Sequence, residues 1–144
     1  MQTSDWVAIA SAIIAVIALI YSWRSNTKKY ELTEQYRNNA LEWYSNTINI
    51  LIELKTKVEC LNNDERFKLL SMLSSQIELG RFFFPNIDKK DSFGENKPLA
   101  YQGYRHIALE FLVFSYNLFM REDAKKHLLH AEELQRHFTS YIIA

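Results

Sequence analysis

The sequence predicts an all-α protein with one N-terminal transmembrane helix, followed by a cytoplasmic four-helix bundle whose first helix is long and can continue from the anchor. Residues 6–23 form an uncharged apolar run. Apolar residues then recur at helical spacing through most of the chain. Only 3 Gly and 2 Pro occur in 144 residues, a composition typical of helices joined by one main loop. We therefore expect an external tail and membrane helix over 1–23 and a bundle over 24–144, with a loop at 86–98.

The membrane segment runs from Trp6 to Trp23 with the sequence WVAIASAIIAVIALIYSW. As a helix it would rise about 27 Å, close to the thickness of a hydrocarbon core. Trp6 at one end, and Tyr21 with Trp23 at the other, would place aromatic rings at both interfaces. The preceding MQTSD has no basic residue and no cleavage site of the A-x-A type follows, so we expect an uncleaved anchor.

The basic residues around this segment predict its orientation. Arg24, Lys28 and Lys29 follow the segment, whereas no Lys or Arg precedes it. The positive-inside rule then places the bundle in the cytoplasm and the N-terminus outside. The predicted location is the bacterial inner membrane, with a single pass through the lipid bilayer.

Small residues recur within the membrane segment at spacings of three and four, the pattern that lets helix backbones approach closely. Such a strip favours a homo-oligomer in which several anchors line a pore, and no charged residue interrupts it. The alternative is an ordinary anchor without a specific partner. The strip comprises Ala8, Ser11, Ala12, Ala15, Ala18 and Ser22.

Helical spacing and turn residues delimit the elements of the bundle. Asn62 to Asp64 would end the first helix and cap the second, and Pro85 would end the second. The segment NIDKKDSFGENKP at 86–98 is polar and turn-rich, as a surface loop requires. The expected helices cover about 27–61, 64–85, 99–120 and 123–142.

Cationic and aromatic residues flank the loop, in GRFFFPN at 80–86 and in KPLAYQGYRH at 97–106. If the helices on either side are antiparallel, these residues converge at one end of the bundle. Aromatic faces and cations together stack bases and neutralise phosphates, which predicts a nucleotide or single-stranded oligonucleotide ligand. The alternative is that the Phe run closes the core and the Arg residues pair with Glu78, Asp88 or Asp91. The candidate ligand-binding residues are Arg81, Phe82, Lys89, Lys90, Lys97, Tyr101, Tyr104 and Arg105.

Other chemistries are not indicated by the sequence. His127, His130, Glu133 and His137 share a helical face, but without an HExxH motif this pattern favours a solvated face, and we predict no metal and no cofactor. The single Cys60 excludes an intramolecular disulfide. No phosphate-binding Gly-rich loop or nucleophile elbow occurs. Adjacent carboxylates such as Glu132 and Glu133 point to different sides of a helix, so we expect no enzyme.

The plan of a short anchor and a helical bundle, with FFFPN at 82–86 and YQGYR at 101–105 around a loop, resembles small bacterial membrane effectors of anti-phage defence. These include the helical channel effector of the Hailong system. The resemblance implies an oligomeric effector that forms a channel or disrupts the membrane. Its gating ligand would be a DNA oligomer, made by a signalling nucleotidyltransferase encoded nearby. The alternative function is a membrane-anchored scaffold or adaptor that docks a cytoplasmic protein.

Overall fold

The computed structural model describes residues 3–60 and 62–143, without the side chains of residues 3–13, 25–30 and 32. Across this described part the protein is all-α, which confirms the predicted helical class, and its only β-type pairing is an isolated bridge between Ile87 and Tyr104. The elements are α1 (Thr3–Lys57), α2 (Asn63–Gly80), the 3-10 helix η1 (Leu99–Tyr101), α3 (Ile107–Met120), the 3-10 helix η2 (Ala124–His127) and α4 (Leu128–Ile143).

The contacts between residues divide the chain into two compact units, residues 1–40 and residues 41–144. Helix α1 contributes to both units, because it continues without a break from Thr3 to Lys57. The predicted long first helix is therefore part of an even longer one. The candidate ligand-binding residues all belong to the second unit.

The predicted transmembrane helix is wrong. Among the residues that the structure describes, no helix combines the length and the apolar character that a membrane crossing needs. Within the expected segment, side chains are described only from Ile14 to Trp23, and all of them are exposed. Ten residues of helix rise about 15 Å, half of a hydrocarbon core. Beyond Trp23 the same helix continues into a polar stretch that includes Glu31, Glu34 and Arg37.

The expected strip of small residues in that segment is only partly visible. Ala8, Ser11 and Ala12 lie outside the described side chains. Ala15, Ala18 and Ser22 are described and exposed. Without the membrane helix, the strip does not support a pore.

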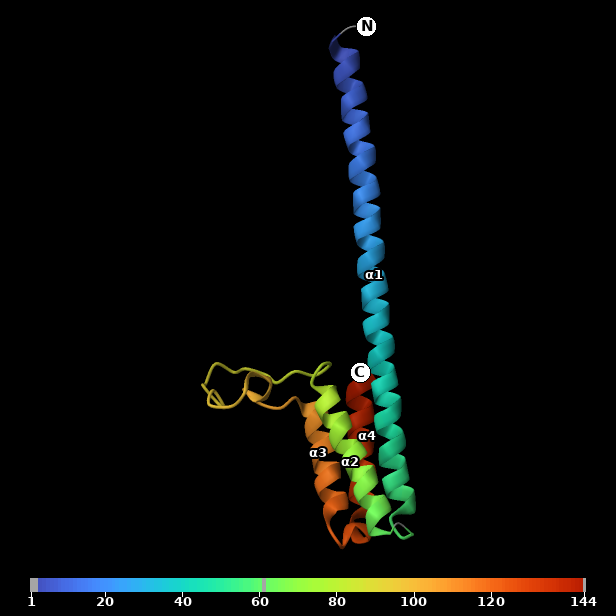
Figure 1. Ribbon diagram of the computed structural model, residues 1–144, viewed down its shortest axis with the longest axis vertical. Helices are drawn as coiled ribbons and strands as arrows, with labels where there is room; N and C mark the ends of the chain where they lie inside the picture. The colour runs from blue at the N-terminus through green and yellow to red at the C-terminus, as the bar shows by residue number, and fades with distance from the viewer. Residues whose placement is uncertain (1–2, 61, 144) are drawn as a thin grey trace. The chain divides into compact units, whose positions relative to one another are not determined.

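The second unit is a bundle in which the last part of α1, α2, α3 and α4 run alternately up and down (Figure 1). All four α-helices contribute to one hydrophobic core, with Leu54, Leu73, Leu112 and Phe138 almost fully buried. Hydrogen bonds tie α1 to its neighbours, from Trp43 Nε1 to the carbonyl of Gln76 at 2.8 Å and from Tyr44 Oη to Thr139 Oγ1 at 3.1 Å.

Polar side chains cap the helices that flank the candidate site. Asn62 Oδ1 accepts a hydrogen bond from the Glu65 amide at 2.8 Å and begins α2, as the sequence predicts. His106 Nδ1 accepts from the Ala108 amide at 3.3 Å and begins α3. The His106 cap therefore fixes where the chain re-enters the bundle after the loop, whereas the Asn62 cap lies at the opposite end of α2.

The third helix begins at Ile107, not near residue 99 as expected. Between them lie the short η1 and an extended stretch that pairs with the chain after α2, where the amides of Ile87 and Tyr104 donate to each other's carbonyls at 2.8 and 2.9 Å. Gly103 permits this pairing, because its φ of 73° is left-handed and a Cβ there would lie 2.6 Å from the Ile87 carbonyl oxygen. Residues 81–106 thus form one connection, called here the α2–α3 loop (Figure 1).

Candidate functional site

Asn86 holds the two ends of the α2–α3 loop together. Its Oδ1 accepts from Arg81 Nη1 at 3.1 Å, and its Nδ2 donates to the Gln102 carbonyl at 2.9 Å. The Gly103 amide donates to the Phe93 carbonyl at 3.0 Å. These bonds, with the Ile87–Tyr104 bridge, organise a long polar segment without a core of its own.

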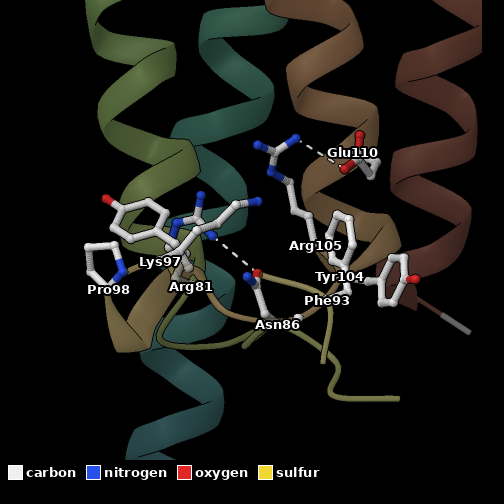
Figure 2. Close-up of a pocket in the computed structure, with 10 residues that line it drawn as sticks. Arg81, Asn86, Phe93, Lys97, Pro98, Tyr104, Arg105 and Glu110 are labelled. Carbon is white, nitrogen blue, oxygen red and sulfur yellow. Dashed lines mark hydrogen bonds and ion pairs between the residues drawn. The ribbon is translucent and has the colours of Figure 1, made fainter. Parts of the chain in front are cut away.

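The loop encloses a cavity of about 560 Å³ against the ends of α2 and α3, within the usual range for small-molecule sites. Figure 2 shows Arg81 and Lys97 on one side of Asn86, and Arg105 with Glu110 on the other. An adjoining hollow of about 590 Å³ shares Arg81, Asn86, Phe93 and Gly103. The first cavity is lined by Arg81, Asn86, Phe93, Lys97, Pro98, Tyr101, Gly103, Tyr104, Arg105 and Glu110.

Arg81 is fully engaged within the protein. Its side chain is 12% exposed, and its Nε donates to Glu78 Oε2 at 3.0 Å while the guanidinium lies 4.4 Å from the centre of the Tyr101 ring. Tyr101 Oη also donates to Glu78, at 2.9 Å. Although burial acts to raise it, the pKa of Glu78 is lowered overall by the hydrogen bonds from Arg81 and Tyr101. Arg81 therefore holds the loop onto α2.

Four side chains form a stack across the loop. The Phe93 and Tyr104 rings are stacked with centroids 4.4 Å apart. Lys89 Nζ lies 4.3 Å from the Tyr104 ring and Lys97 Nζ lies 4.9 Å from the Phe93 ring, so an ammonium group covers each outer face. Tyr104 Oη donates to Asp91 at 2.7 Å, and this bond raises the pKa of Tyr104. The phenol is thus a neutral hydrogen-bond donor at physiological pH.

Arg105 lines the cavity from the end of the α2–α3 loop, two residues before α3 begins. Its Nη1 lies 3.0 Å from Glu110 Oε1, and the two side chains are 34% and 31% exposed. The Nε of Arg105 is buried and has no hydrogen-bond partner within the described part of the chain. Arg105 is more exposed than Arg81, whereas Glu110 is less exposed than Glu78, whose side chain is 50% exposed.

The structure brings most of the candidate residues together. Arg81, Lys97, Tyr101, Tyr104 and Arg105 line the first cavity, Lys90 lines the second, and Lys89 covers Tyr104. Phe82 lines neither cavity and is 80% exposed. The alternative interpretation was that the Arg residues pair with carboxylates and the Phe run closes the core. Arg81 fits it, because this residue pairs with Glu78. Phe83 and Phe84 also fit it, because both pack against the core.

Sequence reasoning missed Asn86, Phe93 and Glu110. A single aromatic residue in an otherwise polar loop is the signal that points to Phe93. α2 ends at Gly80, not at Pro85 as expected, so Asn86 lies in the turn-rich connection, where Asn side chains commonly bond to the backbone. Nothing in the spacing indicates that Glu110 faces Arg105, since this depends on where α3 begins.

The histidines that the sequence places on one helical face are divided between two elements, with His127 in η2 and His130 and His137 in α4. His130 Nδ1 lies 3.7 Å from Glu133, while His127 Nε2 lies 3.3 Å from Asp123. Over the described ranges, no group of three or more His, Cys, Asp or Glu side chains is arranged to hold a metal ion.

The charges of the loop suit an anion that carries a planar ring. Arg81 and Arg105 each pair with a carboxylate. The loop lysines Lys89, Lys90 and Lys97 form no ion pair within residues 3–60 and 62–143. These ammonium groups are exposed and border aromatic faces or hollows.

Comparison of the chain with protein-family models, with curated proteins and with solved structures gave no match. The resemblance to anti-phage effectors stays a prediction.

Proposed function

We propose that this chain is a ligand-sensing protein, not an enzyme, that binds a nucleotide or a short single-stranded oligonucleotide at the α2–α3 loop. The observation that carries the proposal is the Lys89–Tyr104–Phe93–Lys97 stack beside a cavity of about 560 Å³. By its resemblance, the chain would act as the sensing subunit of an oligomeric defence effector. The proposal includes no pore, because a pore needs a membrane-spanning helix and no helix in the described residues could span a membrane.

The lysines are suited to bind phosphate groups. An exposed ammonium that rests on an aromatic face gains about 0.5–1 kcal/mol, so it can exchange this contact for a phosphate at little cost. Lys97 borders the cavity directly, and Lys90 borders the adjoining hollow. A ligand with two or more phosphates would bridge them.

The rings are suited to stack a base. Phe93 is 48% exposed, and the ammonium group of the flexible Lys97 side chain lies over its ring. When Lys97 moves to a phosphate, that face becomes open to a base. Stacking on an aromatic side chain contributes about 1–3 kcal/mol per base and tolerates any base.

The direct test is fluorescence anisotropy with a short fluorescein-labelled oligothymidylate, with ATP as an unlabelled competitor. We expect saturable binding that weakens as salt rises. Lys97→Ala and Phe93→Ala should each weaken it about tenfold, the equivalent of about 1.4 kcal/mol.

The matched control is Lys126→Ala, which removes an exposed lysine from η2, at the other end of the bundle from the loop (Figure 1). Its affinity should equal that of the unmodified chain. An equal loss in Lys126→Ala, or no saturable binding of either probe, contradicts the proposal.

The exposed apolar residues of the loop favour a second candidate, the scaffold that docks a protein partner. Phe82, which follows α2, is 80% exposed, and Leu99, which begins η1, is 87% exposed. Under the scaffold function, Phe82→Ser with Leu99→Ser would abolish co-purification of a defined partner, while Lys97→Ala would not. Under the ligand-sensing function, Phe82→Ser alone would retain oligonucleotide affinity, because Phe82 lines neither cavity.

A further inference from the structure

Resting on the proposed function, we propose that Glu110 is an internal competitor of the ligand: it holds Arg105, and binding transfers the guanidinium from Glu110 to a phosphate. The affinity of the site would then depend on a carboxylate that never touches the ligand. This makes Glu110 a residue that determines specificity by charge.

The two arginines of the cavity differ in how completely they are paired. Arg81 uses Nε, Nη1 and Nη2, which donate to Glu78 and Asn86, and it is 12% exposed. Within the described residues, the Arg105 side chain makes one hydrogen bond, from Nη1 to Glu110 Oε1 at 3.0 Å, and it is 34% exposed. Arg81 is therefore structural, whereas Arg105 is the arginine that can change partner.

The Arg105–Glu110 pair is an imperfect one. Arg105 Nε is buried without an acceptor within the described chain, and a buried donor left unpaired costs about 1–3 kcal/mol. A phosphate can accept two parallel hydrogen bonds from one guanidinium, including Nε. Rotation of the guanidinium from Glu110 to a phosphate in the cavity would satisfy the group better.

Glu110 can lose its partner without great cost. It lies in the first turn of α3, where the partial positive charge of the helix N-terminus stabilises a carboxylate. It is also 31% exposed, so water can solvate it after Arg105 leaves. A ligand with a single weak negative charge would gain little over Glu110, whereas a phosphate that also contacts Lys97 would displace it.

The experiment measures affinity for the fluorescein-labelled oligothymidylate in the full chain. Glu110→Gln should bind about three to ten times more tightly, because the competitor loses its charge. Glu110→Asp keeps the charge and the helix interaction but shortens the side chain, and it should also bind more tightly. The control for net charge is Glu95→Gln, which removes a carboxylate that lines the adjoining hollow.

The decisive arm is the double variant Arg105→Ala with Glu110→Gln. Without Arg105 there is nothing to compete for, so the Glu110 substitution should have no effect. Equal tightening in Glu95→Gln and Glu110→Gln, looser binding in Glu110→Asp, or a Glu110 effect that persists in the Arg105→Ala chain overturns the inference. In each of these outcomes the unmodified chain binds, so the proposed function stands; absence of binding by every variant would instead remove the proposed function. Far-ultraviolet circular dichroism checks that each variant folds.

Discussion

Gly80 lies where α2 packs closely against Trp43 of α1 and Leu109 of α3. A Cβ there would lie 2.6 Å from Leu109 Cδ2 and 2.7 Å from Trp43 Cζ2. Leu109 is fully buried, and the Trp43 ring is held by its hydrogen bond to Gln76, so neither can move aside freely. Gly80→Ala should therefore lower the free energy of unfolding by about 1–3 kcal/mol, despite the better helix propensity of Ala.

Urea unfolding followed by circular dichroism measures the effect of Gly80→Ala. The matched control is Ser74→Ala, at an exposed position of the same helix. This change should leave stability the same or slightly higher. A Gly80→Ala chain as stable as the Ser74→Ala chain would contradict the close packing.

His106 couples the end of the loop to pH. Burial lowers the pKa of His106 from its ordinary value of 6.5, and its Nδ1 must be unprotonated to accept from the Ala108 amide. Below pH 6.5 the unfolded chain therefore binds a proton that the folded chain resists, so the stability from neutral His106 is lost as pH falls through its folded pKa. His106→Asn keeps a capping oxygen but does not titrate.

We expect the unmodified chain to lose more stability than His106→Asn between pH 7.5 and pH 5.5, measured as the urea midpoint. The other three histidines are common to both chains and cancel in the comparison. Equal losses would show that His106 does not contribute.

At the scale of elements, the α2–α3 loop depends on Asn86. Asn86→Ala removes the bonds to Arg81 and to the Gln102 carbonyl, and should destabilise the loop by about 1–3 kcal/mol. Trypsin should then cut faster after Lys89 and Lys90, at the exposed tip. Asn96→Ala, an exposed change in the same loop, should leave the cleavage rate unchanged. Equal rates in the two variants would contradict the role of Asn86.

Helical spacing predicted the elements that depend on local pattern. The cap at Asn62 and the end of α3 at Met120 lie where polar and turn residues indicate them. The start of α3 does not lie where the sequence pattern indicates it. Residues 99–106 have a helical pattern, but the backbone hydrogen bonds to Ile87 and the left-handed conformation of Gly103 stabilise an extended conformation instead. Since this tertiary contact decides which way Arg105 points, the Arg105–Glu110 pair could not be predicted from spacing.

The same limit explains which members of the candidate site were predicted. Residue type alone indicates cations and aromatic rings on both sides of a loop, and Lys97 and Tyr104 do line the cavity. It does not distinguish Arg81, which is engaged with Glu78, from Arg105, which is more exposed. It also does not show that Phe93 stacks on Tyr104.

For the whole molecule, the second unit should fold alone. Among the side chains that the structure describes, those of the hydrophobic core, from Trp43 to Phe138, all belong to residues 41–144. A chain of residues 41–144 should therefore unfold cooperatively on heating, with a midpoint within a few degrees of the full chain. Loss of helical signal in this fragment would show that the core needs residues 1–40.

The first unit carries the apolar side chains that suggested a membrane anchor. Ile14, Ile17 and Leu19 are among those that are more than half exposed, but the run is embedded in a helix that continues to Lys57. If these side chains mediate the proposed homo-oligomer, sedimentation should show assemblies of the full chain and a monomeric 41–144 fragment.

The packing of Trp43 gives the loop an intrinsic optical reporter. Its indole lies 5.7 Å from the Phe83 ring and 5.6 Å from the Phe84 ring, and Phe84 in turn lies 5.0 Å from the His106 ring, so both ends of the loop connect to it. The chain has only two other tryptophans, Trp6 and Trp23. With those two replaced by Phe, the emission spectrum would come from Trp43 alone, and its wavelength and lifetime would follow the loop in real time without a dye.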